Sequence, residues 1–198
     1  MKFFKENSYD VVRLFINQVG IAIFSLILYT ALGMVNIESG NKYTAKAIIS
    51  VFAILFYFAL LYTVAWDWGA KDKIRIEGKR MDPIKFKGAR LAFWANIPNF
   101  VFSFAYALTM GLYCLGVEGV KNISAIFNVL VRFIMSMYLG LILAIFSPFA
   151  SDVLVYNFWQ AVGYFIVPVF AILVTELGYT LGLREKKLLG SAIKKKKQ

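Results

Sequence analysis

Residues 45–66, AKAIISVFAILFYFALLYTVAW, decide the fold class, because Lys46 is the only charged residue among them. A helix that crosses a bilayer needs about 20 apolar residues. The stretch is continuously apolar rather than alternating, which indicates a helix and not a strand. A helix also satisfies all of its backbone groups internally, as lipid requires. We therefore predict a transmembrane helix over these residues.

Four more apolar runs flank this one along the chain. They cover Val11–Met34, Leu91–Leu115, Ile123–Ser147 and Phe158–Leu183. Hydrophobic residues make up 60% of the 198 residues, whereas soluble domains have about 45–50%. The first run is too long for the apolar core of a signal peptide, so we expect it to be retained. The sequence predicts an all-α, polytopic helical membrane bundle that forms a single domain over residues 1–198.

The basic residues are concentrated beside the apolar runs. Eighteen of the 22 Lys and Arg lie within residues 2–13, 67–90 and 184–198. A nucleic-acid-binding protein would instead carry a basic face on a soluble fold. Because positive charge favours the inner side of a membrane, we predict a multi-pass cell-membrane protein with a cytoplasmic N-terminus, a cytoplasmic loop 67–90 and a basic cytoplasmic tail 184–198. These segments would meet the lipid bilayer and its anionic headgroups.

The run Ile123–Ser147 decides how many times the chain crosses. Five full spans would carry the basic tail across the membrane, against the positive-inside tendency. Polar residues recur every four positions at Ser124, Asn128, Arg132 and Ser136, and a charged Arg near the centre of a span costs at least about 2.5 kcal/mol. We predict four spanning helices plus one interfacial or re-entrant helix, with five spans as the alternative.

Polar residues inside the apolar runs form a candidate intramembrane site. Ionisable groups in lipid usually face protein or water, so Arg132 and Glu176 could pair with each other or line a polar cavity. The alternative is that Arg132 extends to the headgroups and Glu176 lies at the interface. Two amides three residues apart could build a pocket or hold two helices together. The candidate residues are Asn96, Asn99, Asn128, Arg132 and Glu176.

The segment 67–90 is a candidate docking loop, because it mixes four acids with eight bases and contains no phosphate-loop motif. Two of the acids could touch a metal or a partner, and the alternative is an ion-paired connector on anionic lipid. In the last run, Gly178 and Gly182 have the spacing that lets another helix approach closely, within this bundle or in a dimer. The docking candidates are Asp67, Asp72, Arg75, Arg80, Lys85 and Lys87.

Two stretches carry a resemblance to a group of known sequences. Trp66–Gly88, with its Trp, Gly, Asp, Arg and Lys-Gly spacing, and Gly178–Arg184 resemble small multi-spanning membrane proteins of low-GC Gram-positive bacteria. The resemblance covers about a third of the chain. It implies a bacterial inner membrane and a tail on the cytoplasmic side, and it implies no activity.

The composition favours a binding protein over an enzyme. The chain has no His and no clustered acids within its apolar runs, so we expect no enzyme, no metal and no cofactor. The single Cys114 excludes an intrachain disulfide and is expected to pack in its apolar run. Size and buried polar residues favour an accessory or solute-binding subunit of a membrane transport system. The alternative is a scaffold, immunity or regulatory protein that binds another membrane protein or itself.

Overall fold

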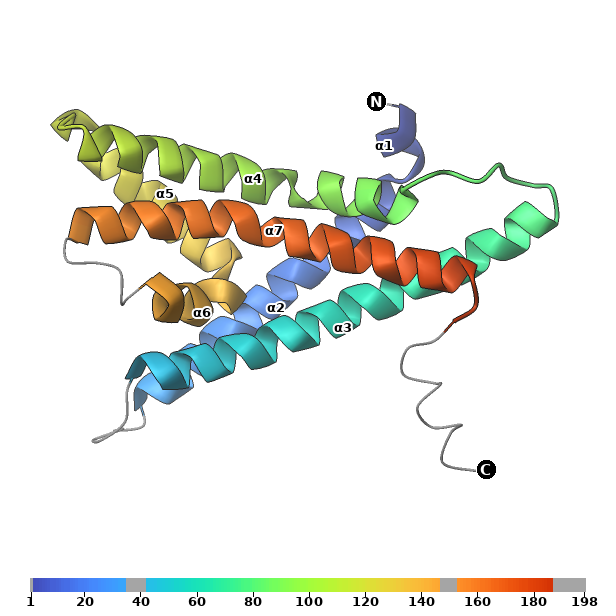
Figure 1. The fold of residues 1–198 in the computed structure, drawn as a ribbon, viewed down its shortest axis with the longest axis horizontal. Helices are drawn as coiled ribbons and strands as arrows, with labels where there is room; N and C mark the ends of the chain where they lie inside the picture. The colour runs from blue at the N-terminus through green and yellow to red at the C-terminus, as the bar shows by residue number, and fades with distance from the viewer. Residues whose placement is uncertain (1, 35–41, 147–152, 187–198) are drawn as a thin grey trace.

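The computed structural model describes residues 2–34, 42–146 and 153–186, and every regular element in these ranges is a helix. Four of them, α2, α3, α4 and α7, are long and apolar enough to cross a bilayer (Figure 1). The elements in chain order are α1 (Lys2–Glu6), α2 (Ser8–Met34), α3 (Lys42–Glu77), α4 (Lys87–Cys114), the 3₁₀ turn η1 (Glu118–Val120), α5 (Lys121–Ile134), α6 (Ser136–Phe146) and α7 (Val153–Leu183).

Helices α4 and α7 pack antiparallel along their length. The start of α4 lies beside the end of α7, where the Ala89 amide donates to Glu176 Oε2 at 2.8 Å. The end of α4 lies beside the start of α7, where a Cβ on Gly111 would be 3.5 Å from the Phe158 ring. We call the end where α2 and α4 begin and α3 and α7 end the basic end of the bundle, and the opposite end the far end.

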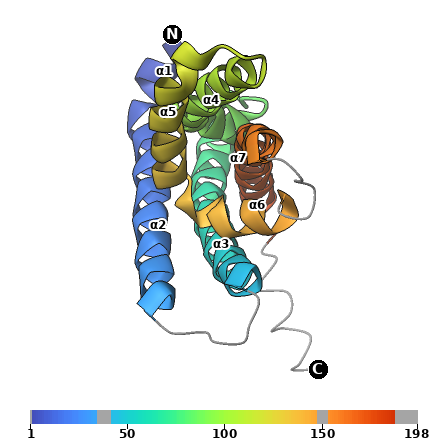
Figure 2. The same cartoon turned by 90° about the vertical axis from the view of Figure 1, so that its left-hand side faces the viewer.

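Helices α5 and α6 form a re-entrant pair. Since α4 ends and α7 begins at the far end, the chain between them enters and leaves the bundle at that end (Figures 1 and 2). The two helices are bent by 86° at Met135. Ser103, halfway along α4, lies 3.6 Å from the Met135 sulfur, and Ser136 donates to the Ala22 carbonyl, halfway along α2, at 2.6 Å. The pair therefore turns at the middle of the bundle, which agrees with four spans and a re-entrant helix and not with five spans.

The polar residues that recur every four positions on the re-entrant pair face protein. Ser124 and Ser136 are buried, and Ser124 lies 3.5 Å from the sulfur of Met110 on α4. Arg132 donates to Gln160 of α7. Because the polar side of α5 is turned inward, its apolar side is exposed at positions such as Ile126 and Val129, which suits contact with lipid.

Glycines bring α3 and α7 into close contact near the basic end. A Cβ on Gly182 would lie 2.2 Å from the carbonyl oxygen of Trp66, and one on Gly69 would lie 2.2 Å from that of Tyr179. A Cβ on Gly178 would lie 2.8 Å from the carbonyl oxygen of Tyr62. No side chain fits at these distances, so the predicted close approach at Gly178 and Gly182 is confirmed as packing within the bundle.

The predicted loop 67–90 is wrong in its extent, because α3 continues as a helix to Glu77 and α4 begins at Lys87. Ion pairs four residues apart support the extension: Lys71–Asp67 at 2.6 Å and Lys73–Glu77 at 3.5 Å. Gly69 is tolerated there because it packs against α7. The connection is thus residues 78–86, and α3 projects past the end of α7 (Figure 1). Most of the predicted tail, residues 187–198, lies outside the described residues.

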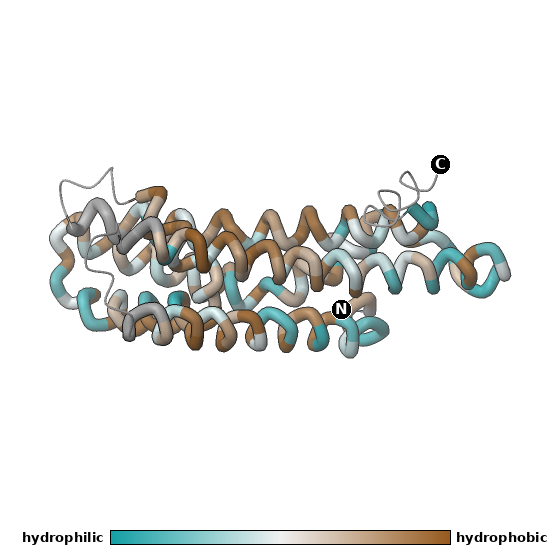
Figure 3. Tube along the Cα trace, turned by 90° about the horizontal axis from the view of Figure 1, so that it is seen from below, coloured by the Kyte–Doolittle hydropathy of each residue, from teal (hydrophilic) through white to brown (hydrophobic). Residues whose placement is uncertain are grey.

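Hydropathy along the trace follows the spans. Hydrophobic residues dominate the middle of the long helices, and hydrophilic residues gather toward the two ends (Figure 3). Large apolar side chains such as Ile48, Leu55 and Leu173 are exposed on the outside of the bundle. A soluble protein rarely exposes so much contiguous apolar surface, so the chain is a multi-pass helical membrane protein.

Candidate functional site

The predicted intramembrane polar residues lie in three separate places, and the first joins α2 to α4. Asn99 Nδ2 donates to Gln18 Oε1 at 2.9 Å and to Asn96 Oδ1 at 2.8 Å. Asn96 Nδ2 in turn donates to the Ala92 carbonyl at 2.8 Å. Gln18, Asn96 and Asn99 are all buried. These amides bond to one another and to backbone, and Asn99 Oδ1 is the buried atom of the three that has no hydrogen-bond partner among the described residues. The bonds between the amides favour the interpretation that they hold two helices together.

Glu176 occupies the second place, at the basic end. Its Oε2 atom accepts the hydrogen bond from the Ala89 amide in the first turn of α4. The first amides of a helix lack partners within the helix, and a carboxylate there also interacts favourably with the helix dipole. Glu176 thus caps α4 from α7 and lies far along the bundle from Arg132, so the pairing of the two that the sequence allowed does not form.

Arg132 and Asn128 occupy the third place, on α5 in the far half of the bundle. Arg132 Nη2 donates to Gln160 Oε1 at 3.0 Å, and Gln160 is completely buried. Asn128 lies one helical turn before Arg132. No hydrogen bond between described residues joins this group to the amides around Asn99, whose partners lie on α2 and α4.

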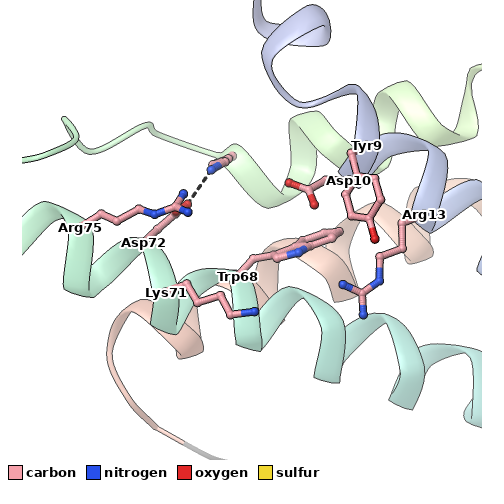
Figure 4. Close-up of a pocket in the computed structure, with 8 residues that line it drawn as sticks. Tyr9, Asp10, Arg13, Trp68, Lys71, Asp72 and Arg75 are labelled. Atoms are coloured by element: carbon pink, nitrogen blue, oxygen red, sulfur yellow. Dashed lines mark hydrogen bonds and ion pairs between the residues drawn. The ribbon is translucent and has the colours of Figure 1, made fainter.

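A pocket of about 220 Å³ lies at the basic end, and we call it the basic pocket (Figure 4). Three elements build it: the beginning of α2, the extension of α3 and the first residue of α4. Helix α3 extends past the apolar run, and so it brings one charged face beside the start of α2. The pocket is lined by Tyr9, Asp10, Arg13, Trp68, Lys71, Asp72, Arg75 and Lys87.

A buried ion pair forms one wall of the basic pocket. Lys87 Nζ lies 2.6 Å from Asp72 Oδ2, and Asp72 and Lys87 are 2% and 7% exposed. The Tyr179 hydroxyl donates to the same oxygen at 2.9 Å, and Arg75 Nη1 lies 3.6 Å from Asp72 Oδ1. The Asp72 carboxylate therefore joins α3, α4 and α7 and is saturated by its partners.

The lining of the basic pocket has an excess of positive charge. Four cationic side chains face two carboxylates, which gives a net charge of +2. Lys71 is also held by Asp67 at 2.6 Å, whereas no ion pair to Arg13 is found in the part of the chain that the structure describes. The indole of Trp68 lies between these charged groups (Figure 4) and is 8% exposed. A cationic pocket lined by two aromatic rings, Tyr9 and Trp68, is suited to an anionic group that carries an apolar or planar part.

Three of the six predicted docking residues line the basic pocket: Asp72, Arg75 and Lys87. Asp67 pairs with Lys71 outside it, and Arg80 and Lys85 are exposed on the connection 78–86. Sequence reasoning missed the remaining lining residues. For Trp68 and Lys71 a signal exists in the sequence, because positions 68, 71, 72 and 75 share one face of a helix. That signal is lost when the segment is taken for a loop. The residues missed are Tyr9, Asp10, Arg13, Trp68 and Lys71.

The basic pocket combines open volume with charged side chains. Its cations and its two aromatic rings can hold an anion by charge and packing. Comparison with known proteins adds no further guide to the ligand: no protein-family model matches the chain, and no curated protein and no solved structure shows a significant match to it.

Proposed function

We propose that this membrane protein binds an anionic, phosphate-bearing ligand in the basic pocket and serves as an accessory or solute-binding subunit of a membrane transport system. The observation that carries the proposal is the net charge of +2 around a cavity of about 220 Å³. Phosphate groups are bound by Arg and Lys through short, charge-assisted hydrogen bonds. Arg13 forms no ion pair among the described residues, although the Asp10 carboxylate interacts with it at longer range, and we take it as the main anchor.

The position of the basic pocket supports a ligand at headgroup depth. It lies where α3 leaves its apolar stretch and where α2 begins, at the end of the bundle that gathers the basic segments. With the positive-inside tendency, that end faces the cytoplasm, as do both termini, and the protein lies in the cell membrane. The phosphate then belongs to an anionic lipid headgroup or to a soluble cytoplasmic solute, and these two sources share the same binding chemistry.

The transport part of the proposal is supported by the re-entrant pair. Breaks in membrane helices are tolerated where the backbone is buried in protein or lines a cavity, and transporter sites are commonly built from discontinuous helices. Here the break at Met135 lies at the middle of the bundle. The chain has no nucleotide-binding motif of its own, so in this role it works with another membrane protein that supplies the driving force, and we propose no enzymatic activity for it.

Binding to the pocket can be measured on the full chain in nanodiscs of zwitterionic lipid. The probes are labelled inorganic phosphate and, separately, phosphatidic acid added to the nanodisc. The variant pair Arg13→Gln and Arg75→Gln, combined, is expected to lower the affinity at least about tenfold, equal to 1.4 kcal/mol. Arg80→Gln is the matched control, because Arg80 is exposed outside the pocket. Equal affinity of the wild type and the double variant would overturn the pocket assignment.

The two probes also separate the sources of the phosphate. Saturable binding of inorganic phosphate points to a soluble solute, and binding of phosphatidic acid alone points to a headgroup. The subunit role is tested by mild extraction from native membranes followed by mass spectrometry. A co-purifying transport ATPase or permease supports the subunit role. A lone chain with bound lipid contradicts that role but does not contradict ligand binding in the basic pocket.

A second candidate function is a scaffold or regulator that binds another membrane protein through the α3 extension. The observation that favours it is the projection of the last residues of α3, 73–77, past the end of α7 (Figure 1), with Arg75 and Glu77 exposed on it. Reversal of charges there that lie outside the basic pocket, as in Lys73→Glu with Glu77→Lys, keeps the local ion pair and changes the surface pattern. Loss of a partner with this variant, and not with Arg13→Gln, would favour the scaffold.

A further inference from the structure

Arg132 is held inside the far half of the bundle by α7. It lies in the last turn of α5, one turn before the break at Met135. Its Nη2 atom donates to Gln160 Oε1 at 3.0 Å. Gln160 is 0% exposed and lies in the second turn of α7, which begins at the far end. The guanidinium is thus turned toward protein and does not extend along the outside of the bundle.

Polar atoms around Arg132 lack partners. In the described ranges, Arg132 Nε, Gln160 Nε2 and Asn128 Oδ1 are buried and form no hydrogen bond. No carboxylate of those ranges forms an ion pair with Arg132. A partly buried cation without a counter-charge and buried donors without acceptors are both costly. Three orphaned atoms from two helices at one place therefore indicate that something polar completes the group.

The orphaned atoms specify what would complete it. Asn128 lies four residues before Arg132, so a small rotation could let its oxygen accept from Arg132 Nε. After that rotation the guanidinium would still have no counter-charge, and Gln160 Nε2 would still have no acceptor. A group that compensates the charge and accepts from Gln160 must be negative and must accept more than one hydrogen bond. A carboxylate has this chemistry, because its two oxygens match the fork of a guanidinium.

We propose that Arg132 and Gln160 form a binding site for a carboxylate that enters from the far end of the bundle. Both α5 and α7 begin at that end, and Arg132 is only partly buried, so the site is not sealed. The site is remote from the basic pocket, which is built by the opposite ends of α2, α3 and α4. With the basic end facing the cytoplasm, the carboxylate comes from outside the cell.

Thermal unfolding of the full chain in detergent micelles tests the site, with sodium acetate and sodium butyrate as probes and sodium chloride at equal ionic strength as the reference. The wild type should be stabilised more by the carboxylates than by chloride. Arg132→Gln should abolish this difference. Lys121→Gln should keep it, because Lys121 is an exposed cation at the start of the same helix. Equal responses of Arg132→Gln and the wild type, or no carboxylate effect in the wild type, would overturn the proposal.

Gln160→Glu is the second variant, and it tests the site even if Arg132→Gln does not fold. It puts a carboxylate of the chain's own beside the guanidinium, where the ligand is proposed to lie. This variant should unfold at a higher temperature than the wild type in chloride and should no longer respond to acetate. A Gln160→Glu protein that responds to acetate as the wild type does would contradict the site.

Discussion

The ammonium group of Lys87 lies 2.6 Å from the carboxylate of Asp72, and both side chains are almost completely buried where α3, α4 and α7 meet. A second Lys–Asp pair, Lys71–Asp67, has the same 2.6 Å separation but is exposed. The two pairs lie within one helical turn of each other along α3. They therefore offer an internal comparison of what burial does to an ion pair.

Removal of one partner of the buried pair should destabilise the protein strongly. Lys87→Met leaves Asp72 buried without its main cation, and we expect a loss of about 3 kcal/mol of unfolding free energy. Lys71→Met should cost less than about 1 kcal/mol, because exposed pairs are screened by solvent. Denaturant unfolding in detergent micelles measures both.

The pair should also be coupled. When Asp72→Asn is added to Lys87→Met, the Tyr179 hydroxyl keeps an acceptor and no unpaired charge is left in the wall. The double variant should therefore be more stable than the sum of the two single variants predicts. Strict additivity of the single effects would show that the two groups do not act as a pair.

Close packing of α3 on α7 should make Gly182 intolerant of a side chain. A Cβ there would lie 2.2 Å from the Trp66 carbonyl oxygen, so Gly182→Ala must separate the helices, at a cost of about 1–3 kcal/mol. Gly20→Ala is the control, since nothing lies within 4 Å of its Cβ position, and we expect it to be neutral or stabilising. Thermal unfolding compares the two, and equal midpoints would refute the close contact.

The amide cluster should act as a link between helices and not as a ligand site. Asn99→Leu removes the donor to Gln18 and Asn96, and we expect a loss of about 0.6–1.7 kcal/mol. Asn17 is next to Gln18 in sequence, and its side chain forms no hydrogen bond to another described helix. Asn17→Leu should therefore lower the unfolding free energy by less. A double-mutant cycle of Gln18→Leu with Asn99→Leu measures the coupling, and a value of zero would contradict the link.

Much of the fold follows from the sequence, because lipid imposes simple rules. The apolar runs predict the four spans to within a few residues at most ends, and the recurrence of Ser124, Asn128, Arg132 and Ser136 supports the prediction that the fourth run does not cross. The basic tail predicts that the fourth run does not cross. Each inference depends on transfer free energies that act on every residue independently of the tertiary contacts.

The site was harder to predict, because it depends on how helices far apart in sequence meet. The turn formers Gly69 and Gly78 suggest a loop, yet Gly69 lies inside α3 because α7 packs against it. Once that segment is taken for a loop, the shared face of Trp68, Asp72 and Arg75 disappears. The separation of Arg132 from Glu176 likewise follows from the re-entrant turn at Met135, which no local pattern specifies.

The side of the membrane on which each end lies tests the account most directly, because the re-entrant pair fixes both proposed sites to opposite faces. The single Cys114 is exposed at the end of α4, contrary to the expectation that it packs, so a membrane-impermeant maleimide can reach it at the far end. In a Cys114→Ser background, Arg80→Cys and Gln198→Cys report on the connection 78–86 and on the C-terminus. We predict that intact cells label Cys114 alone and that Arg80→Cys and Gln198→Cys are labelled only after the membrane is opened. Labelling of Gln198→Cys but not of Arg80→Cys in intact cells would show five spans, labelling of both would show the opposite orientation, and either result would contradict the account.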